Sequence, residues 1–508
     1  MTTTLLAMLL CVSAFIVSAE AEADEDYEAK KAAYRQKIMD DDVTTDDFLI
    51  GSWVSFYSFE KDSYETQLDQ MAVAGINFNI FPRDFGEGWM HDAAYWDNVE
   101  EQYAKRNMVY MMNGNMDINL VRIGVRFAEG KEHCIGYHVK DEPTGDILQD
   151  VGRQMQAYRQ ADPTRYPFTN LLPSYAATTL LGGTYREHVE NYVAAVGAEN
   201  MEYLSHDFYP FLEGGAVLKT IFSDMEVMRS VAYENGKMKT HAFPQSTSWS
   251  GVRMPNIDEM RWHVYGYLAY GFKALTWFNM VCPIGFDNSV ILGDGSIPDQ
   301  ALYDAWSELN WEVRGMSSIL MNLDAAHAYH VRKNARGVEY LPKDFFLQPA
   351  ADATNDFVIS YMEAKDGGAP YVMIFNKSYD SNAHCVFALD ASSSVEGLDY
   401  FDPFTGEHIA TDLSDGMLRD TFRPGEGKLY RINVRADEEE TTETITVTET
   451  DSATNAVTDT TTQASDTATE QGDAGGCHST ATIMPLLMIC LLPTVAWTTY
   501  KRRRKEMF

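Results

Sequence analysis

Short apolar runs alternate with longer amphipathic stretches between about residues 47 and 322. This alternation is typical of strand–helix units arranged around a parallel sheet. The apolar runs predict strands at Leu49–Val54, Ile76–Phe81, Met108–Met112, Ile135–Val139, Phe168–Leu172, Tyr203–Ser205, Lys239–Phe243 and Ala274–Phe278. The intervening stretches predict helices that include 64–74, 98–106, 147–159, 257–270 and a last one at about 300–323.

Eight strands, each followed by a helix, predict an α/β fold, a closed (β/α)8 TIM barrel over residues 47–323. The alternative is a doubly wound open sheet. That alternative is less economical because no Gly-rich nucleotide loop follows the first strand.

The pattern changes after the barrel. Short alternating runs such as Tyr371–Phe375, Cys385–Leu389 and Lys428–Val434, separated by turns at 366–368 and 403–406, predict a small antiparallel β-sandwich over 324–435. Residues 20–46 before the barrel have the character of an acidic helical lead-in. Residues 436–476 are rich in Thr and Glu with almost no large apolar groups, so they predict a solvated, disordered stalk.

Both ends of the chain predict export. An apolar run from Leu5 to Val17, followed by Ser18 and Ala19, predicts a signal peptide over 1–19. The uncharged stretch 481–500 is long enough to span a bilayer, and the basic tail 501–508 should remain cytoplasmic. Together these features predict a single-pass cell-surface protein with its N-terminus outside and a C-terminal transmembrane helix as its membrane anchor.

Composition narrows the possible partners. The formal net charge of -35 argues against a nucleic-acid partner, because binding phosphates requires clustered cations. The cysteines are dispersed without a C-x-x-C spacing, so Cys134, Cys282 and Cys385 should be buried free thiols. No His, Asp or Glu cluster has the spacing of metal ligands, so we expect neither a catalytic metal nor another cofactor.

Polar and aromatic side chains gather where the predicted strands end. In a TIM barrel the catalytic groups come from the C-terminal ends of the strands. Flat rings and paired hydrogen-bonding groups are what a sugar needs, so a carbohydrate substrate is expected. The candidate substrate-binding residues are Trp53, Asn113, Asp141, Asn170, Tyr209, Gln245, Trp249 and Trp277. His138 and His241, within strands, are interpreted as core groups.

Glycoside hydrolysis normally needs two carboxyl groups. Glu142, after the fourth strand, is the candidate general acid, and apolar surroundings or the neighbouring Asp141 would raise its pKa. The alternative is that Asp141 or Glu142 caps the helix expected near Pro143. Asp207, after the sixth strand, is the second candidate, as nucleophile or base; it could instead cap the next helix or bind a sugar hydroxyl. Asp84 and Asp287 are expected at turns or at the rim.

Three segments carry a resemblance to a known group of enzymes. Residues Gly136–Pro143, Tyr203–Pro210 and Tyr267–Phe278 resemble the clan-A glycoside hydrolases, especially the family 42 and related β-galactosidase-like barrels, over about residues 47–322. The resemblance implies an O-glycosyl hydrolase acting on an oligo- or polysaccharide. It also implies an acid Glu at the end of strand 4, a nucleophilic Glu at the end of strand 7, and a trailing β-sandwich.

The chain departs from that pattern at two places. Asp141 stands where the clan usually has Asn before the acid. The end of strand 7 offers Gln245, Ser246 and Thr247, and therefore no carboxylate. Three explanations stay open: strand 7 has another register, Asp207 replaces the missing group, or the barrel binds glycan without hydrolysing it. A separation of about 5 Å between the Glu142 and Asp207 carboxyls would suit a retaining reaction and a longer one inversion, whereas opposite directions would refute the pair.

Overall fold

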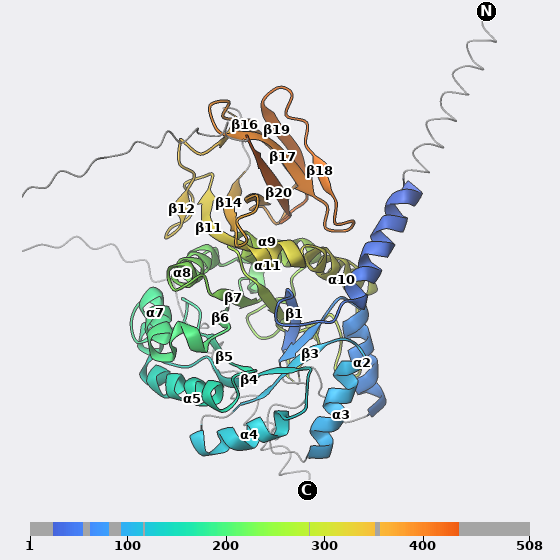
Figure 1. Ribbon diagram of the computed structural model, residues 1–508, viewed down its shortest axis with the longest axis vertical. Helices are drawn as coiled ribbons and strands as arrows, with labels where there is room; N and C mark the ends of the chain where they lie inside the picture. The colour runs from blue at the N-terminus through green and yellow to red at the C-terminus, as the bar shows by residue number, and fades with distance from the viewer. Residues whose placement is uncertain are drawn as a thin grey trace, which may run out of the picture.

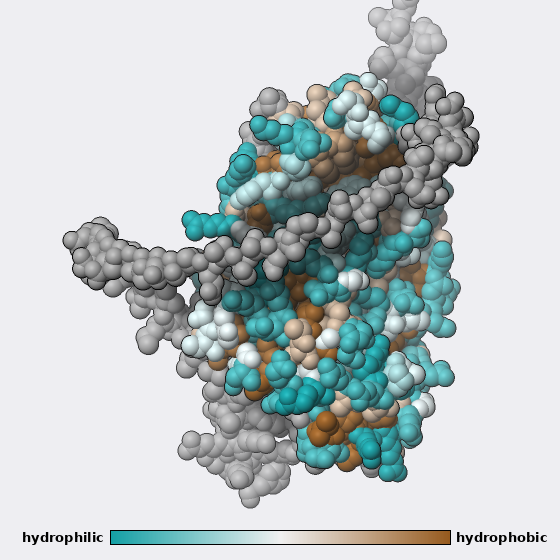
Figure 2. All heavy atoms as spheres, turned by 60° about the vertical axis from the view of Figure 1, so that its left-hand side comes forward, coloured by the Kyte–Doolittle hydropathy of each residue, from teal (hydrophilic) through white to brown (hydrophobic). Residues whose placement is uncertain are grey.

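A computed structural model describes residues 24–53, 61–80, 93–114, 117–283, 285–350 and 356–435 (Figure 1). The expected signal peptide, stalk, membrane anchor and basic tail lie outside these residues, as does Asp84. Among the described helices, none is both long and apolar enough to cross a membrane. Hydrophilic side chains cover most of the described surface in Figure 2, as the acidic composition leads one to expect.

The eight predicted strands are present and close into a parallel barrel in the order β1-β2-β3-β4-β5-β6-β7-β9. Their bounds are β1 Leu49–Trp53, β2 Phe78–Ile80, β3 Val109–Asn113, β4 Cys134–Asp141, β5 Tyr166–Leu171, β6 Tyr203–Asp207, β7 Lys239–Phe243 and β9 Ala274–Trp277. Every predicted strand overlaps an observed one. The TIM-barrel prediction is therefore confirmed, and with it the fold that the clan-A resemblance implies.

Alternate residues of the strands fill the barrel interior with apolar rings and chains, as the period of two in a strand requires. The buried interior set includes Leu49, Phe78, Ile80, Val109, Met111, Tyr166, Phe168, Tyr203, Phe243 and Ala274. Two polar rings, His138 and His241, lie among them. His241 shares hydrogen bonds with Ser205 Oγ (2.7 Å) and Thr276 Oγ1 (2.8 Å), and burial holds its pKa well below the usual range. His241 is thus a neutral core group, as predicted.

Helices surround the barrel and bury a second, larger core against the outer faces of the strands. Their bounds are α2 Lys61–Val73, α3 Ala93–Ala104, α4 Val121–Ala128, α5 Leu148–Ala161, α6 Thr178–Leu181, α7 Tyr185–Val196, α8 Ile221–Glu234, α9 Ile257–Ala269, α10 Gln300–Gly315 and α11 Ser317–Asn322. Short 3-10 turns are η2 Ile118–Leu120, η3 Gly145–Ile147, η4 Ala198–Asn200 and η5 Glu213–Gly215. Capping boxes start α7 at Thr184 and α9 at Asn256, which fixes where these helices begin.

The helix expected at about 300–323 is divided into α10 and α11. The break follows Gly315, where a Cβ atom would lie only 1.7 Å from the carbonyl oxygen of Pro403. Glycine is needed there because the sandwich turn approaches the helix backbone directly. A contact between residues 88 positions apart is not visible in the local pattern of the helix.

Two antiparallel sheets follow the barrel, as predicted. The larger has the order β12-β11-β14-β15-β20-β17-β18 and the smaller β13-β16-β19. Their bounds are β11 Leu323–His330, β12 Glu339–Tyr340, β13 Leu347–Pro349, β14 Phe357–Ala364, β15 Tyr371–Asn376, β16 Ala383–Leu389, β17 Val395–Phe401, β18 His408–Ala410, β19 Met417–Phe422 and β20 Gly427–Val434. Only the short β11–β12 pair is parallel among these. A buried apolar layer joins the two sheets into a sandwich.

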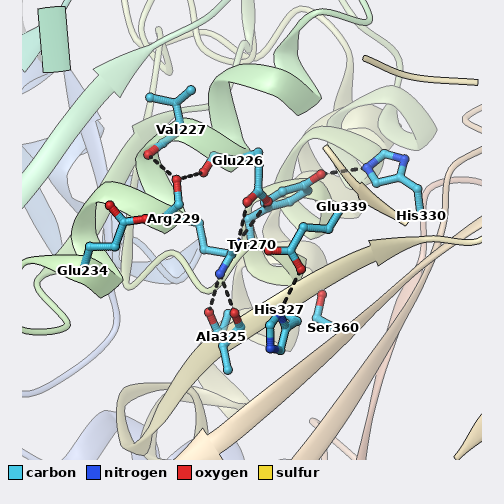
Figure 3. A network of polar contacts seen from close by, with 12 residues as sticks. Glu226, Val227, Arg229, Glu234, Tyr270, Ala325, His327, His330, Glu339 and Ser360 are labelled. Carbon is cyan, nitrogen blue, oxygen red and sulfur yellow. Dashed lines mark hydrogen bonds and ion pairs between the residues drawn. The ribbon is translucent and has the colours of Figure 1, made fainter. Parts of the chain in front are cut away.

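The sandwich packs against the helical side of the barrel through α8 and α9 (Figure 1). Figure 3 shows the polar part of this junction. The guanidinium of Arg229 donates to Glu226 Oε1 (2.5 Å), to Glu339 Oε1 (2.9 Å) and to the carbonyl of Ala326 (2.6 Å). The helix at residues 24–40 also contacts the rest of the fold, since Tyr34 donates to the carbonyl of Gly315.

Candidate active site

Glu142 follows β4 in an unusual backbone conformation. Its φ of +43° lies in the left-handed region, which non-glycine residues rarely adopt. The backbone N–H of Glu142 donates to the carbonyl of Asn170 on β5 (3.1 Å), which holds the turn in place. Strain of this kind persists where the surroundings fix it, and such places cluster at functional sites.

Glu142 and Asp141 do not cap a helix. The 3-10 turn η3 has Thr144 as its N-cap, and α5 has Ile147. Asp207 does not cap a helix either, because the N-caps of η5 and α8 are Leu212 and Thr220. The capping interpretation of the three carboxyls is therefore wrong, and another reason is needed for their placement.

Asp207 is the last residue of β6 and is 5% exposed. Its Oδ1 atom has no hydrogen-bond partner among the described residues. A buried carboxylate oxygen without a partner costs free energy, and Asp224 and Asp356 each keep one as well.

The barrel brings Glu142 and Asp207 together. Their carboxyls form a hydrogen bond that raises the pKa of Glu142 and lowers that of Asp207, so Glu142 is the donor. Burial, Asp207 and Asp141 together hold the pKa of Glu142 well above its usual range. Burial and Asp141 raise the pKa of Asp207 to about 7, although hydrogen bonds with Glu142 and Tyr209 work against this rise. Two carboxyls in such contact titrate as a pair that shares a proton.

The proximity of Glu142 and Asp207 tests the relative placement of the two carboxyls that the sequence left open. The two carboxyls face each other, so opposite directions are excluded. The two carboxyls therefore meet at the same end of the barrel, where a glycosidic bond could lie against both.

Asp141 completes an acidic cluster, which we define as Asp141, Glu142 and Asp207. Burial raises the pKa of Asp141, while a hydrogen bond with Asn170 and the charge of Lys140 lower it. The ammonium of Lys140 donates to the backbone carbonyl of Asp141 (2.9 Å). Asp141 and Glu142 are partly exposed, so the cluster reaches solvent.

Asn170 connects this cluster to the barrel interior. Its Oδ1 lies 3.3 Å from Nε2 of His138, and burial lowers the pKa of that ring to about 3. The neutral His138 ring packs edge-on against Trp53, with 5.0 Å between the ring centroids. Trp53 and Asn170 therefore lie beside the cluster, as expected for residues predicted at the C-terminal ends of β1 and β5. The register of β3 against β4 pairs Asn113 with His138, which places Asn113 at the same level.

Aromatic rings form a wall next to the acidic cluster. The hydroxyl of Tyr209 lies near all three carboxyls, which contribute to the high pKa of that phenol. The Tyr209 ring contacts Trp249 (5.2 Å) and Phe278 (4.8 Å), and Trp249 contacts Phe286 (5.4 Å). The sequence identified Tyr209 and Trp249 but missed Phe278 and Phe286 as candidates.

Two predicted binding residues lie elsewhere. The indole N–H of Trp277 donates to Asn310 Oδ1 (2.9 Å), and its ring packs against Trp306 in the outer core. Trp277 therefore lies among the helices, whereas the next residue, Phe278, joins the aromatic wall. The alternation along β9 contained this signal, because Thr276 faces inward to His241 and Trp277 must then face outward.

Gln245 is fully buried and bonded to backbone. Its amide N–H donates to the carbonyl of Arg253 (2.6 Å), and its oxygen accepts from the N–H of Phe211 (3.2 Å). The observed β7 has the same bounds as the predicted strand, so a different register does not supply a carboxylate there. Asp287, expected at the rim, is exposed.

Among the described residues no group of three His, Cys, Asp or Glu side chains is arranged to hold a metal ion. The described cysteines are free thiols. Cys134 and Cys385 are buried as predicted, but Cys282 is partly exposed, which corrects the expectation for that residue.

No family model and no curated protein sequence matches the chain. Solved structures with a similar course of the chain include a catalytic mutant of a family 42 β-galactosidase from G. stearothermophilus (9% identity, 77% of this chain, 99% of that chain, TM-score 0.49). A family 5 glycoside hydrolase from Bacteroides vulgatus shares 11% identity over 76% of this chain and 89% of that chain, with a TM-score of 0.46. The chain spans 62% of a β-galactosidase from the psychrophilic Marinomonas ef1 (8% identity, 55% of this chain, TM-score 0.42). The reaction has to be inferred from the side chains of this chain.

Proposed function

We propose that this protein is a glycoside hydrolase in which Glu142 is the general acid and Asp207 is the nucleophile or base. The observation that carries the proposal is the hydrogen-bonded Glu142–Asp207 pair at the carboxyl ends of β4 and β6. Cleavage of a glycosidic bond needs one protonated and one ionised carboxyl. Burial and the neighbouring carboxyls raise the pKa of Glu142 well above its usual range, which favours its protonated form.

The division of roles follows from the surroundings. Glu142 keeps its proton because it is packed against two other carboxyls, so it can protonate the leaving oxygen. Asp207 accepts a hydrogen bond from Tyr209, which favours its ionised form. Ionised Asp207 can attack the anomeric carbon or activate a water, depending on how far substrate separates it from Glu142. The rings of Tyr209 and Trp249 offer apolar surface to the C–H face of a sugar.

The test is release of reducing sugar from a panel of oligosaccharides by the full chain. Glu142→Gln should reduce turnover by about 10²–10⁴-fold, the usual contribution of a general acid. Glu129→Gln, at an exposed carboxyl after α4, is the matched control and should leave turnover unchanged. Undiminished turnover in Glu142→Gln would remove the assignment.

A second candidate function is glycan binding without hydrolysis. It is favoured by the end of β7, where Gln245 is committed to backbone hydrogen bonds and cannot act as a nucleophile. A glycan array that shows binding, together with no released sugar under any condition of the panel, would select this candidate. Product formation would eliminate it.

We also propose that the protein is exported and remains anchored to the membrane. The apolar segments 5–17 and 481–500 and the basic residues 501–505 support this proposal. Protease treatment of intact cells should release residues 24–435 as a soluble fragment, while the C-terminal tail stays with the membrane fraction. Recovery of the intact chain in the soluble fraction of lysed cells would contradict it.

A further inference from the structure

A pocket of about 270 Å³ lies between the loop that follows β7 and the loop that follows β9. None of its lining residues belongs to the acidic cluster or to the aromatic wall. Val290 in its lining is buried, whereas Asn256 and Asp299 are exposed, so the pocket opens to solvent. Both loops follow the carboxyl ends of barrel strands, which places the pocket at the same end of the barrel as the acidic cluster.

The size of the pocket indicates what it can hold. Liquid water takes about 30 Å³ per molecule, so the space is far larger than one or two bound waters need. Pockets that enclose a drug-sized ligand have about 300–1,000 Å³, which is more than this one offers. The pocket therefore suits a single ring of a larger molecule.

Hydrogen bonds between the two loops hold the pocket open without a ligand. The short strands β8 (Thr247–Ser248) and β10 (Asn288–Ser289) pair across the loops. The hydroxyl of Thr247 donates to the carbonyl of Asn288 (2.6 Å) and accepts from the hydroxyl of Ser289 (2.6 Å). A site whose groups are already fixed loses little conformational freedom when a ligand binds.

Three polar side chains of the pocket have unused hydrogen-bonding capacity. Asn256 and Asp299 cap α9 and α10, and the Oδ1 of each accepts from a backbone N–H of the first turn (2.9 and 3.1 Å). The Oδ1 of Asn288 accepts from the N–H of Ser289 (2.9 Å). Within the described part of the chain, this leaves the amide N–H groups of both Asn side chains and Oδ2 of Asp299 for a ligand.

These groups together favour a neutral ligand that carries hydroxyls. A hydroxyl both donates and accepts, so it can pair with the amides and with the carboxylate. An anion is disfavoured by the charge of Asp299, and the helix ends beside it are already capped. A wholly apolar ligand would leave the polar groups unpaired. Met254, Val290 and Leu302 supply the apolar surface that the C–H face of a sugar ring needs.

The pocket is connected to the acidic cluster through the aromatic wall. Thr247, which bonds to the pocket residues Asn288 and Ser289, lies two residues before Trp249, at most about 7 Å along an extended chain. The Trp249 ring contacts that of Tyr209, whose hydroxyl lies near all three carboxyls. One ligand chain that follows these contacts reaches both places.

We propose that this pocket binds one neutral sugar unit of a glycan whose bond to be cleaved lies at the acidic cluster. The choice of a glycan rests on the proposed function, although the pocket takes no part in the cleavage itself. Asn256 and Asn288 donate to hydroxyls of this unit, and Asp299 accepts from one. Long oligosaccharides are therefore held at the pocket and at the cluster, and short ones at the cluster alone.

The experiment compares β-1,4-linked disaccharides and hexasaccharides of glucose, galactose and mannose as substrates of the full chain. Leu302→Trp fills the pocket, so the ratio of kcat/KM for the hexasaccharide to that for the disaccharide should fall by about 10-fold, the effect of one or two lost hydrogen bonds. Ala301→Trp is the matched control. It places the same ring one position earlier on α10, at an exposed residue outside the pocket, and should leave the ratio unchanged.

Asp299→Asn separates the ligand contact from the helix cap. Asn is as good an N-cap as Asp, so α10 should begin at the same residue, while the free carboxylate oxygen is replaced. The ratio should fall by about 2- to 10-fold, as expected for one hydrogen bond, with an unchanged melting temperature. A thermal melt also checks that Leu302→Trp is folded.

The outcomes separate the inference from the proposed function. An unchanged ratio in folded Leu302→Trp, or an equal fall in Ala301→Trp, would overturn the inference and leave the glycosidase function standing. If no sugar is cleaved, the Kd of each hexasaccharide, measured by calorimetry, replaces kcat/KM. Binding that Leu302→Trp weakens and Ala301→Trp does not would then support the inference and overturn hydrolysis, whereas no binding of any hexasaccharide would overturn the inference outright.

Discussion

Buried charged groups occur at both the barrel–sandwich junction and the barrel mouth, but their hydrogen-bond and ion-pair partners differ. At the junction, Arg229 is bonded to two carboxylates and to backbone carbonyls, so its charge is satisfied (Figure 3). At the mouth, Glu142 and Asp207 raise or lower each other's pKa without a cationic partner for either carboxyl, and one oxygen of Asp207 has no hydrogen-bond partner among the described residues. The charge at the junction is fully paired and stabilises the fold, whereas several carboxyls gathered at a strand end with raised pKa values are candidates for chemistry.

The pKa values show the same difference. At the junction, the two carboxylates raise the pKa of Arg229, which keeps it charged at every physiological pH. At the mouth, burial raises the pKa of Asp207 to about 7, so its charge changes near neutral pH. Arg229 at the junction therefore stays charged, whereas Asp207 at the mouth can gain or lose a proton near neutral pH.

The largest effect on stability is expected from breaking the junction. Arg229→Met removes the partner of the buried Glu226 and leaves Glu339 paired with His327 alone. Removal of one member of a buried pair costs about 3–5 kcal/mol of unfolding free energy. Urea denaturation of the full chain measures this loss, and kcat should stay unchanged. Arg153→Met, at an exposed pair with Asp150, is the control and should change stability by less than about 0.5 kcal/mol. A loss of kcat without a loss of stability would contradict the purely structural role of Arg229.

Asp207→Asn should have the opposite effect on stability. The raised pKa of Asp207 means that the folded state binds more protons than the unfolded state between about pH 4 and 7, so its contribution to stability is present at low pH and lost as pH rises through about 7. Asn cannot ionise, so the variant should gain roughly 2–4 kcal/mol over the natural chain at pH 8 and almost nothing at pH 4. Unfolding free energies at the two pH values measure this gain.

Asp224→Asn is the matched control for that gain. Asp224 on α8 is also buried, burial raises its pKa to about 7, and its Oδ1 likewise has no hydrogen-bond partner among the described residues. It lies outside the acidic cluster, where its Oδ2 accepts a hydrogen bond from the backbone N–H of Ser174. Both variants should be stabilised at pH 8, and only Asp207→Asn should lose activity. Equal activity in the two variants would remove Asp207 from the reaction.

Gln245→Glu tests whether a carboxyl at the end of β7 can take part in the reaction. The change removes the amide N–H that donates to the Arg253 carbonyl and places a carboxylate in a buried position. It should cost about 1–3 kcal/mol of stability, the penalty for unsatisfied buried groups, with no gain in turnover. A rise in kcat would show that Gln245 lies in the reacting site after all.

Trp277→Phe should have the smallest effect. The variant loses the hydrogen bond from the indole to Asn310, worth about 0.5–1.5 kcal/mol, and retains most of the packing. KM should not change, because the side chain lies in the outer core. Trp249→Phe, in the aromatic wall, is the comparison and should raise KM; a raised KM in Trp277→Phe instead would place Trp277 at the substrate.

Much of the barrel could be predicted from the sequence because each strand is a compact apolar run. The meeting of Glu142 with Asp207 also follows, since the carboxyl ends of parallel strands gather at one end of a barrel. The sequence could not place Gln245, because its partners are backbone groups of Arg253 on its own loop and of Phe211 on the loop after β6. Contacts between loops leave no periodic signal.

The misassigned Trp277 had another cause. Residue type and position at the strand end favour Trp277 as a ligand contact, although the faces of β9 alternate and only one of two adjacent rings can point inward. The positive φ of Glu142 was equally hidden, because a Glu-Pro sequence normally predicts an extended residue before the proline. In both cases the backbone geometry, rather than the composition, decides which side chain reaches the site.

The central claim is that Glu142 and Asp207 act as one coupled pair. The most direct test is the pH dependence of kcat/KM for the natural chain and for Asp207→Asn on the best oligosaccharide of the panel. We expect a bell-shaped profile with at least one limb near pH 7, well above the range of an ordinary carboxyl, and loss of that limb together with most of the activity in Asp207→Asn. An unchanged profile and undiminished kcat/KM in Asp207→Asn would contradict the account.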